Sequence, residues 1–238
     1  ASDVYKRQLW YNPARSGHGF DLELTGNVLS LTWYTYEDNG SPTWYQASAP
    51  YANPWMPELK RYTRNPAGGA PIGSTVGALN LSFVDARNGS FGWTLGSRSG
   101  TEPVQILLGA DVPAIPDRTG IWYDPLESGW GLSINSTANV RSALVYFYDA
   151  NQQPRWVLGL GSNAASETVS MQSLRGFCPD CSFAATTAVN GGSLTLDFNG
   201  ARAASIRTDV FFADQPNAPW RRGPVAIVPL SDPAPTPP

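Results

Sequence analysis

Three residues near the start of the chain are of the types that acid–base catalysis uses. Asp21 and Glu23 are two residues apart, so on a β-strand both carboxylates point to the same face, and paired carboxylates carry out glycoside hydrolysis. His18 is the only histidine of the chain. Strand alternation places His18 and Asp21 on opposite faces, however, which counts against a shared site. A hydrolase that uses the carboxylate pair is therefore kept as the remote alternative.

The motif around these residues occurs a second time in the chain without the titratable groups. The three positions are taken there by Trp130, Ser133 and Asn135. We therefore interpret the two carboxylates of the first copy as part of a solvated strand face, and the histidine as a half-exposed ring packed on a turn. We expect no catalytic residue, no metal site and no cofactor.

Cys178 and Cys181 form a second motif that could carry chemistry, in the stretch GFCPDCSF. Two cysteines at this spacing serve as a redox pair, as half of a zinc site or as a short disulfide. Zinc needs two further ligands, and the chain has no other cysteine and no second histidine. Thioredoxin-type chemistry needs a helix N-terminus in an α/β fold. We favour a disulfide, which persists in an oxidising compartment and so indicates a secreted, periplasmic or cell-surface protein.

The composition indicates which elements must position these residues. The 238 residues include 23 Gly, 21 Pro, nine Trp, ten Tyr and nine Phe, while charged residues make up 15%. Such a profile is typical of a β-rich protein with many turns. The net charge of −3 and the lack of a basic stripe count against nucleic-acid binding. No apolar run reaches the roughly 18 residues that span a membrane.

The chain contains one long internal repeat. When the sequence is shifted by 112 residues, 9–48 aligns with 121–160 without a gap, and fifteen of the forty positions are identical. The strongest match is between LWYNPARSGHGF and IWYDPLESGWGL. A three-residue insertion follows, after which 77–83 matches 192–198. Each half therefore holds one unit of roughly 110 residues, the size of a small domain.

Alternation and turn residues predict about eight antiparallel strands in each unit. Segment 27–37 is expected to return at 41–49 through a tight turn at Asn39–Gly40, and a second hairpin is expected around Asn88–Gly89. The other strands of the first unit are expected at 9–11, 18–26, 58–64, 77–85, 90–96 and 102–109.

Sequential hairpins indicate an all-β fold of two tandem meander units. Eight strands in this order close into a small barrel without free edges, and a two-sheet sandwich is the competitor. In the third strand, Leu29, Leu31 and Trp33 share one face while Tyr34 and Tyr36 share the other. Because both faces carry large apolar groups, one is expected to fill the unit's interior and the other to meet the second unit.

The expected boundaries are 9–110 for the first unit, 111–119 for a linker and 120–230 for the second unit. Two prolines in the linker are expected to hold the units in a fixed relation. Residues 231–238 are interpreted as a Pro-rich tail that leads to a neighbouring domain of the full-length protein. Residues 1–8, ASDVYKRQ, match the translation of a sequencing adapter, so we interpret them as foreign to the protein and its source as a bacterial metagenomic fragment.

The pattern GIWYDPLESGWGLSI followed by YFYDANQQPRW resembles a domain of secreted proteins of Gram-negative bacteria, which is written GxWxxPxxSGxG followed by YxYDxxGxPxW. The resemblance covers both units and is most specific in their first forty residues. It implies an exported accessory domain that accompanies other extracellular domains, and it supplies neither a settled function nor catalytic residues.

The shorter stretch WYNPARS is similar to the first strand of avidin-type and lipocalin-type barrels. In avidins an asparagine and a serine four residues later contact the ligand. The matching residues are Asn12 and Ser16, with Asp124 and Ser128 in the second unit, whereas Pro13 departs from the avidin pattern. This resemblance implies a small-ligand carrier.

The function that these observations predict is a non-catalytic, exported binding or accessory module that recognises glycan or protein through aromatic residues. Tyr34, Tyr36, Tyr146 and Tyr148 are expected to line its site, since a tyrosine hydroxyl can point at a ligand. The alternative is the small-ligand carrier, which predicts a cavity of roughly several hundred Å³ in each unit. A barrel interior filled with Trp and Leu counts against this alternative.

Overall fold

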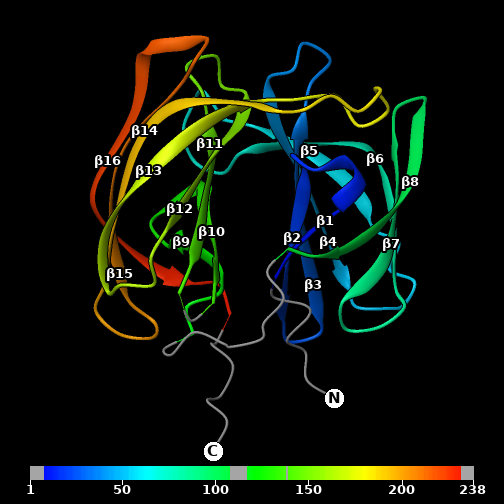
Figure 1. The fold of residues 1–238 in the computed structure, drawn as a ribbon, viewed down its shortest axis with the longest axis horizontal. Coiled ribbons are helices and arrows are strands. Elements are labelled where there is room, and N and C mark those ends of the chain that lie inside the picture. Colours follow the sequence, from blue (N-terminus) through cyan, green and yellow to red (C-terminus); the bar gives the residue numbers. More distant parts are fainter. Residues whose placement is uncertain (1–7, 108–116, 138, 232–238) are drawn as a thin grey trace, which may run out of the picture.

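The computed structural model describes residues 8–107, 117–137 and 139–231. They form two closed antiparallel barrels of eight strands each, and within each barrel neighbouring strands follow one another in chain order. The barrels stand side by side (Figure 1). The predicted all-β meander is confirmed, with a barrel rather than a sandwich in each unit. Residues 1–7, most of the predicted linker and nearly all of the predicted tail lie outside the described residues.

The first barrel contains eight strands and one short 3-10 helix. Its elements are β1 (Leu9–Tyr11), η2 (Pro13–Arg15), β2 (Gly19–Thr25), β3 (Val28–Tyr36), β4 (Pro42–Pro50), β5 (Glu58–Thr63), β6 (Ile72–Phe83), β7 (Asn88–Leu95) and β8 (Arg98–Ile106). β1 pairs with β8 and closes the barrel.

The second barrel repeats this order. Its strands are β9 (Gly120–Asp124), β10 (Glu127–Ser136), β11 (Arg141–Tyr148), β12 (Pro154–Gly161), β13 (Ser166–Arg175), β14 (Thr187–Phe198), β15 (Ala204–Phe212) and β16 (Gln215–Pro229). β16 pairs with β9 and closes the barrel. Within the described part of the chain, no helix has the length and apolar character needed to cross a membrane.

One of the two predicted hairpin turns is correct and the other is displaced. Gly40 occupies the tight turn between β3 and β4 with a φ of +79°. The turn between β6 and β7 lies before Asn88, which is already the first residue of β7. The Asp85 side chain accepts hydrogen bonds from the backbone N–H groups of Arg87 (2.7 Å) and Asn88 (2.8 Å). An aspartate that caps two amides thus sets this turn in place of the Asn-Gly pair.

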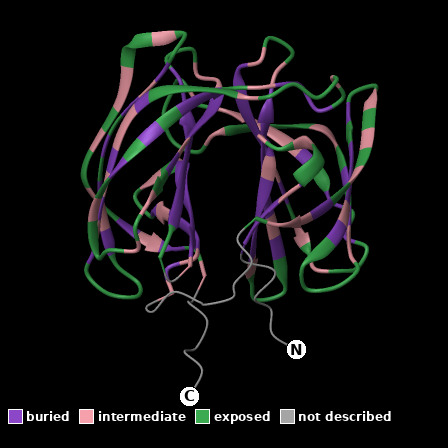
Figure 2. Cartoon of the chain, in the orientation of Figure 1, coloured by how far each residue is buried: buried purple, intermediate pink, exposed green. Residues whose placement is uncertain are grey.

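Each barrel interior is filled by its own apolar cluster. The first contains, among others, Trp10, Phe20, Trp33, Trp55, Phe91 and Trp93. The second contains, among others, Trp122, Trp130, Phe147, Leu194, Leu196 and Phe212. Figure 2 shows that buried residues are concentrated on the strands where the barrels face each other.

A third cluster lies between the barrels and confirms the prediction for the two faces of β3. Leu29, Leu31 and Trp33 belong to the interior of the first barrel, whereas Tyr34 and Tyr36 belong to the cluster between the barrels. The outer face of an antiparallel strand is usually solvated, but here the second unit covers it.

The contact between the barrels has approximate two-fold symmetry. Trp44 donates its indole N–H to the backbone O of Phe147 (3.4 Å), and its counterpart Trp156 donates to the backbone O of Thr35 (3.1 Å). Thr35 and Phe147 are themselves counterparts in the repeat. Equivalent patches of the two units therefore meet as they do in an isologous dimer, here within one chain.

Candidate functional site

The four tyrosines predicted to line a ligand site are packed between the barrels. None is more than 8% exposed, and the ring centroids of Tyr34 and Tyr146 lie 6.1 Å apart. Burial raises the pKa of both hydroxyls above the ordinary tyrosine value, so they stay protonated. Tyr36 donates its hydroxyl to the backbone O of Gly17 (2.7 Å). Of the four tyrosines, Tyr148 also borders the pocket described below.

The prediction that Asp21 and Glu23 form a solvated strand face is wrong, because both are 1% exposed between the barrels. Asp21 accepts a hydrogen bond of 2.5 Å from Ser133, its own counterpart in the repeat. Glu23 accepts from the backbone N–H of Ile121 (3.0 Å) and from the hydroxyl of Ser231. A strand face that a single barrel leaves in water is covered here by the second barrel. The carboxylates therefore join the two units instead of facing a substrate.

The residues that the avidin resemblance singles out lie in the repeated turns. Asn12 and Asp124 are buried, and each side chain accepts from the backbone N–H two residues later, at 3.0 and 2.8 Å. Such bonds cap turns. Ser16 and Ser128 are exposed. The equivalent geometry in both units is fully accounted for by turn formation.

Two connections reach from one barrel onto the repeated turn of the other. Segment 176–186, between β13 and β14, lies on residues 12–19 of the first unit, and we term this contact the first junction. It is the yellow segment that crosses between the barrels in Figure 1. Segment 64–71, between β5 and β6, lies on residues 124–131 of the second unit, and we term this contact the second junction.

Backbone hydrogen bonds show that the two junctions are equivalent. The N–H of Gly176 donates to the O of Gly40 (3.2 Å), and the N–H of Arg64 donates to the O of Gln152 (3.3 Å). Gly40 and Gln152 are counterparts in the repeat. Gly176 and Arg64 therefore begin equivalent connections. The residues that follow them, Phe177 and Asn65, are counterparts.

Phe177 fills the first junction. Its ring meets His18 edge-on at 5.3 Å and Tyr36 at 6.5 Å between centroids, and the Arg15 guanidinium lies 4.9 Å from its centroid. Arg15 also donates hydrogen bonds of 2.9 and 3.0 Å to two backbone carbonyls of the same connection. An aromatic ring, a cation–π contact and two backbone hydrogen bonds thus seal this turn.

His18 is buried in this junction and stays neutral at neutral pH. It is 6% exposed, which is less than the half-exposed ring that the sequence predicted. Burial, and secondarily the positive charge of Arg15, lowers its pKa to about 4. Glu102 lies 3.6 Å from the imidazole and accepts from Asn12 (2.9 Å), and its pKa is raised by burial. The contact therefore joins a carboxyl group to a neutral ring rather than to a cation.

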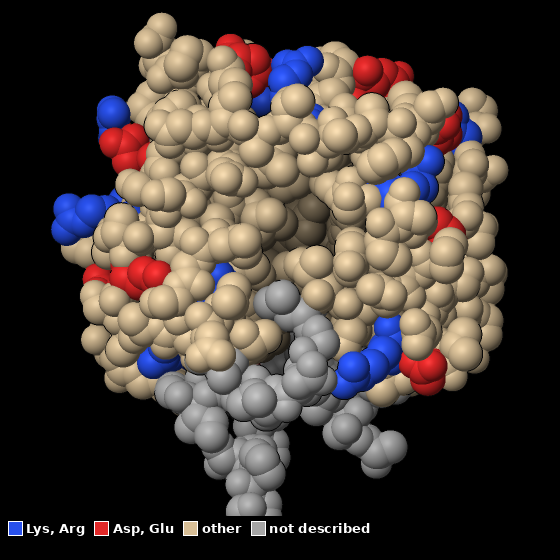
Figure 3. All heavy atoms as spheres, viewed as in Figure 1, with Lys and Arg blue, Asp and Glu red and all other residues tan. Residues whose placement is uncertain are grey.

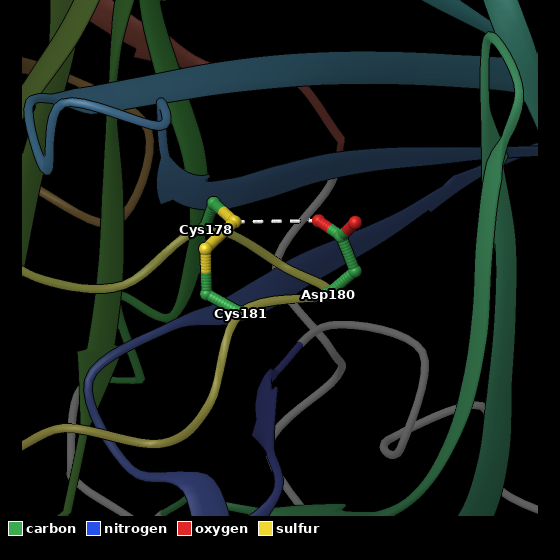
Figure 4. A group of neighbouring side chains, drawn as sticks. All are labelled: Cys178, Asp180 and Cys181. Atoms are coloured by element: carbon green, nitrogen blue, oxygen red, sulfur yellow. Dashed lines mark hydrogen bonds between the residues drawn. A yellow bond between two sulfur atoms is a disulfide. The ribbon is translucent and has the colours of Figure 1, made fainter.

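A disulfide closes the connection of the first junction. Cys178 and Cys181 lie at bonding distance, with an S–S separation of 1.97 Å, which confirms the predicted pairing. Figure 4 shows the bond, with the Asp180 carboxylate 3.3 Å from the Cys178 sulfur. These three residues are the group whose types and proximity suit a metal ion. Because each sulfur is bonded to the other, neither is a thiolate ligand.

The second junction encloses a pocket of about 170 Å³ at the mouth of the second barrel. Its floor is aromatic and its rim is polar or glycine-rich. The lining residues are Arg64, Asn65, Gly68, Gly69, Pro71, Leu126, Glu127, Ser128, Gly129, Trp130, Phe147, Tyr148, Trp220 and Arg222. Trp130 and Trp220 meet edge-on at 5.3 Å, and Phe147 stacks on Trp220 at 4.7 Å.

One ion pair lies at the rim of this pocket. Arg222 donates to Glu127 (2.8 Å), and its guanidinium lies 5.1 Å from the Trp220 centroid. The indole N–H of Trp130 and the hydroxyl of Tyr148 are buried and have no hydrogen-bond partner among the described residues. Rings with polar groups at their edges and a paired rim suit recognition of a small ring-shaped group.

The pocket is hollow because its connection is shorter and lacks a ring. Segment 64–71 spans eight residues and segment 176–186 spans eleven, which locates the three-residue insertion of the repeat. Asn65 stands where Phe177 stands in the other connection. Its side chain turns back to accept from the backbone N–H of Ala67 (3.0 Å).

A wider hollow of about 480 Å³ lies between the β3–β4 and β11–β12 turns. Its charged groups satisfy each other, with Arg61 donating to Glu37 (2.7 Å) and Arg155 donating to Asp214 (2.8 Å). On the face shown in Figure 3, charged side chains lie around the margin, mostly beside a group of opposite sign, and the surface is hollowed between the barrels. The aromatic pocket of the second junction is therefore the stronger candidate.

Most residues of the candidate site escaped the sequence argument. Of the residues that line the pocket, the sequence predicts Ser128 and Tyr148 as ligand-binding, and it shows Trp130 only as the counterpart of the single histidine. Trp220 and Arg222 lie outside the gapless part of the repeat, where counterparts are hard to match. The one usable indication was the three-residue insertion, which predicts that the two units differ at one connection.

No family model, no curated protein and no solved structure matches this chain. The family resemblances derived from its motifs therefore remain predictions.

Proposed function

We propose that the chain is a non-catalytic, exported binding module that recognises glycan or protein through aromatic side chains, with the pocket of the second junction as its site. The observation that carries this proposal is the pocket's floor, where Trp130, Phe147 and Trp220 gather at the mouth of an otherwise filled barrel. Binding surfaces concentrate such rings because they bury a large area at a low entropic cost.

The filled interiors make the small-ligand carrier the less favoured function. Large side chains occupy the centre of both barrels. A pocket of about 170 Å³ is smaller than the roughly 300–1,000 Å³ of a site that encloses a whole small-molecule ligand. It has room for one sugar ring or one side chain of a larger ligand.

Export is the second part of the proposal, and the disulfide supports it. A bond between Cys178 and Cys181 persists in an oxidising compartment and is reduced in the cytosol. Fractionation of the native bacterial host, with an antibody against this chain, tests the assignment. Recovery with the cytosolic fraction contradicts it.

The site is tested by probing glycan and peptide arrays and then titrating the strongest ligand against three forms of the protein. Trp220→Ala is expected to weaken binding at least about tenfold, because an aromatic wall of the pocket is lost. Arg221→Ala is the matched control, since Arg221 pairs with Asp209 (3.2 Å) outside the pocket, and its affinity is expected within about twofold of wild type. Equal affinity of Trp220→Ala and wild type rules out this pocket as the site.

A further inference from the structure

The first junction shows what kind of group fits the second. Besides Phe183 of its own connection, three residues of the first unit contact the Phe177 ring, namely Arg15, His18 and Tyr36. Their counterparts after a shift of 112 residues are Glu127, Trp130 and Tyr148. All three counterparts line the pocket of the second junction. We term the site around Phe177 the seat of the first junction, and the equivalent site formed by Glu127, Trp130 and Tyr148 the seat of the second junction. Phe177 fills the first seat, and the second seat is open.

We infer that the open seat binds an aromatic side chain presented by a segment of a partner protein. This inference rests on the proposed function and names the ligand class of the same site. The partner's ring enters between Trp130, Tyr148 and Pro71 of segment 64–71. Phe177 lies in the same way between His18, Tyr36 and its own connection.

The groups at the rim favour an aromatic side chain over a sugar. A sugar needs polar partners around the edge of its ring, whereas Arg222 and Glu127 already bind each other at 2.8 Å. Leu126, which is 95% exposed, and Pro71, which lies opposite Gly129, add apolar surface beside this ion pair. The ring edges of Trp130 and Tyr148 suit the edge-to-face contact that His18 makes with Phe177.

The test uses small probes of each class and the indole N–H signals of Trp130 and Trp220 in a ¹⁵N-labelled protein. N-acetyl-phenylalaninamide is expected to shift both signals with a millimolar dissociation constant, whereas N-acetyl-leucinamide and a methyl glucoside are not. Each signal is assigned with a Trp→Phe variant.

Two variants change the number of open seats. Asn65→Phe places a ring at the position of Phe177 and is expected to weaken probe binding at least about tenfold, because the seat is filled. Val84→Phe is its control, since it adds a ring at a site that is 80% exposed and outside the pocket. Phe177→Ala vacates the first junction and is expected to raise the stoichiometry from one probe to two. Val189→Ala, on β14 and 50% exposed, is its control and leaves the stoichiometry at one.

The outcomes separate this inference from the proposed function. Indole shifts with the phenylalanine probe that vanish in Asn65→Phe support the inference, even if Phe177→Ala does not fold. Shifts with the methyl glucoside alone overturn it and leave a glycan-binding site at the same pocket. No shift with either probe overturns it as well, and the array experiment then decides whether the pocket is a site at all.

Discussion

The two junctions of this protein are built from the same repeat and differ in whether they are closed. In the first, Phe177 and a disulfide-closed connection seal the turn around His18. In the second, a connection shorter by three residues leaves about 170 Å³ above Trp130. A duplicated fold can thus keep its framework while one copy uses a seat for its own stability and the other leaves it open.

The charges at the two junctions are also reversed. Arg15 of the first unit faces Glu102 (3.7 Å), while its counterpart Glu127 faces Arg222 (2.8 Å). The turn residue has changed sign, and an ion pair with the last strand of the barrel is kept, with Glu102 on β8 and Arg222 on β16. Electrostatic complementarity between the turn and the closing strands therefore belongs to the framework, whereas the ring in the seat does not.

The largest expected effect comes from emptying the closed junction. Phe177→Ala removes a ring that is 5% exposed and is expected to lower the free energy of unfolding by about 3–4 kcal/mol. Urea unfolding followed by tryptophan fluorescence measures it. Pro71→Ala, a truncation in the connection of the open junction, is expected to cost less than about 1 kcal/mol. Equal losses for both variants would remove the contrast between the junctions.

The second-largest effect is expected from acidification, which weakens the closed junction. The pKa of His18 falls from its ordinary 6.5 to about 4 on folding, so its contribution is complete above pH 6.5 and is lost as the pH falls through about 4. The full difference is roughly 3 kcal/mol. Glu102, whose pKa is raised, offsets part of it. Between pH 7 and 4, the free energy of unfolding is expected to fall more steeply with decreasing pH for wild type than for His18→Asn. Superimposable curves would contradict the burial of a neutral His18.

The disulfide is expected to contribute less. Its cysteines are three residues apart, and the chain-entropy model assigns so short a loop roughly 2 kcal/mol. The variant Cys178→Ser with Cys181→Ser, unfolded beside disulfide-bonded wild type, measures this value, and reduced wild type is expected to match the variant. The indole signals of Trp130 and Trp220 serve as the control, because they lie at the other junction. A change in those signals would mean that the junctions are coupled.

The ion pairs are expected to have the smallest effect. Side-chain exposure is 26% and 11% for Arg15 and Glu102, and 41% and 26% for Glu127 and Arg222, so solvent screens both pairs. A double-mutant cycle on each pair is expected to give about 0.5–1 kcal/mol of coupling. A coupling energy between Glu127 and Arg222 above this range would mean that the rim of the second junction is more rigid than the exposure of the two side chains implies.

Much of the fold could be predicted from the sequence because its information is local. The alternation of Leu29, Leu31 and Trp33 with Tyr34 and Tyr36 depends only on the period of a strand, and the structure confirms both faces. The displaced β6–β7 turn shows the limit of this reasoning. There the capping side chain of Asp85 decides between two turn positions that composition allows equally well.

The candidate site could be predicted only in part, because it depends on contacts between distant segments. Arg15 and Pro179, which meet at 2.9 Å, are 164 residues apart in the chain. No local period reports such a contact. The wrong prediction for Asp21 and Glu23 has the same cause. A polar strand face is predicted to be solvated, but here the second barrel covers it.

By itself, the sequence determined the duplication, because two segments of forty residues match. It also determined the order of the strands, the two faces of β3 and the cysteine pairing, because each of these is written within a few tens of residues. Only the tertiary structure decided which face of each turn is covered, that His18 is buried, and that one seat is filled while the other is open. The docking of two barrels sets these outcomes, and it depends on the shapes of whole surfaces rather than on any stretch of chain.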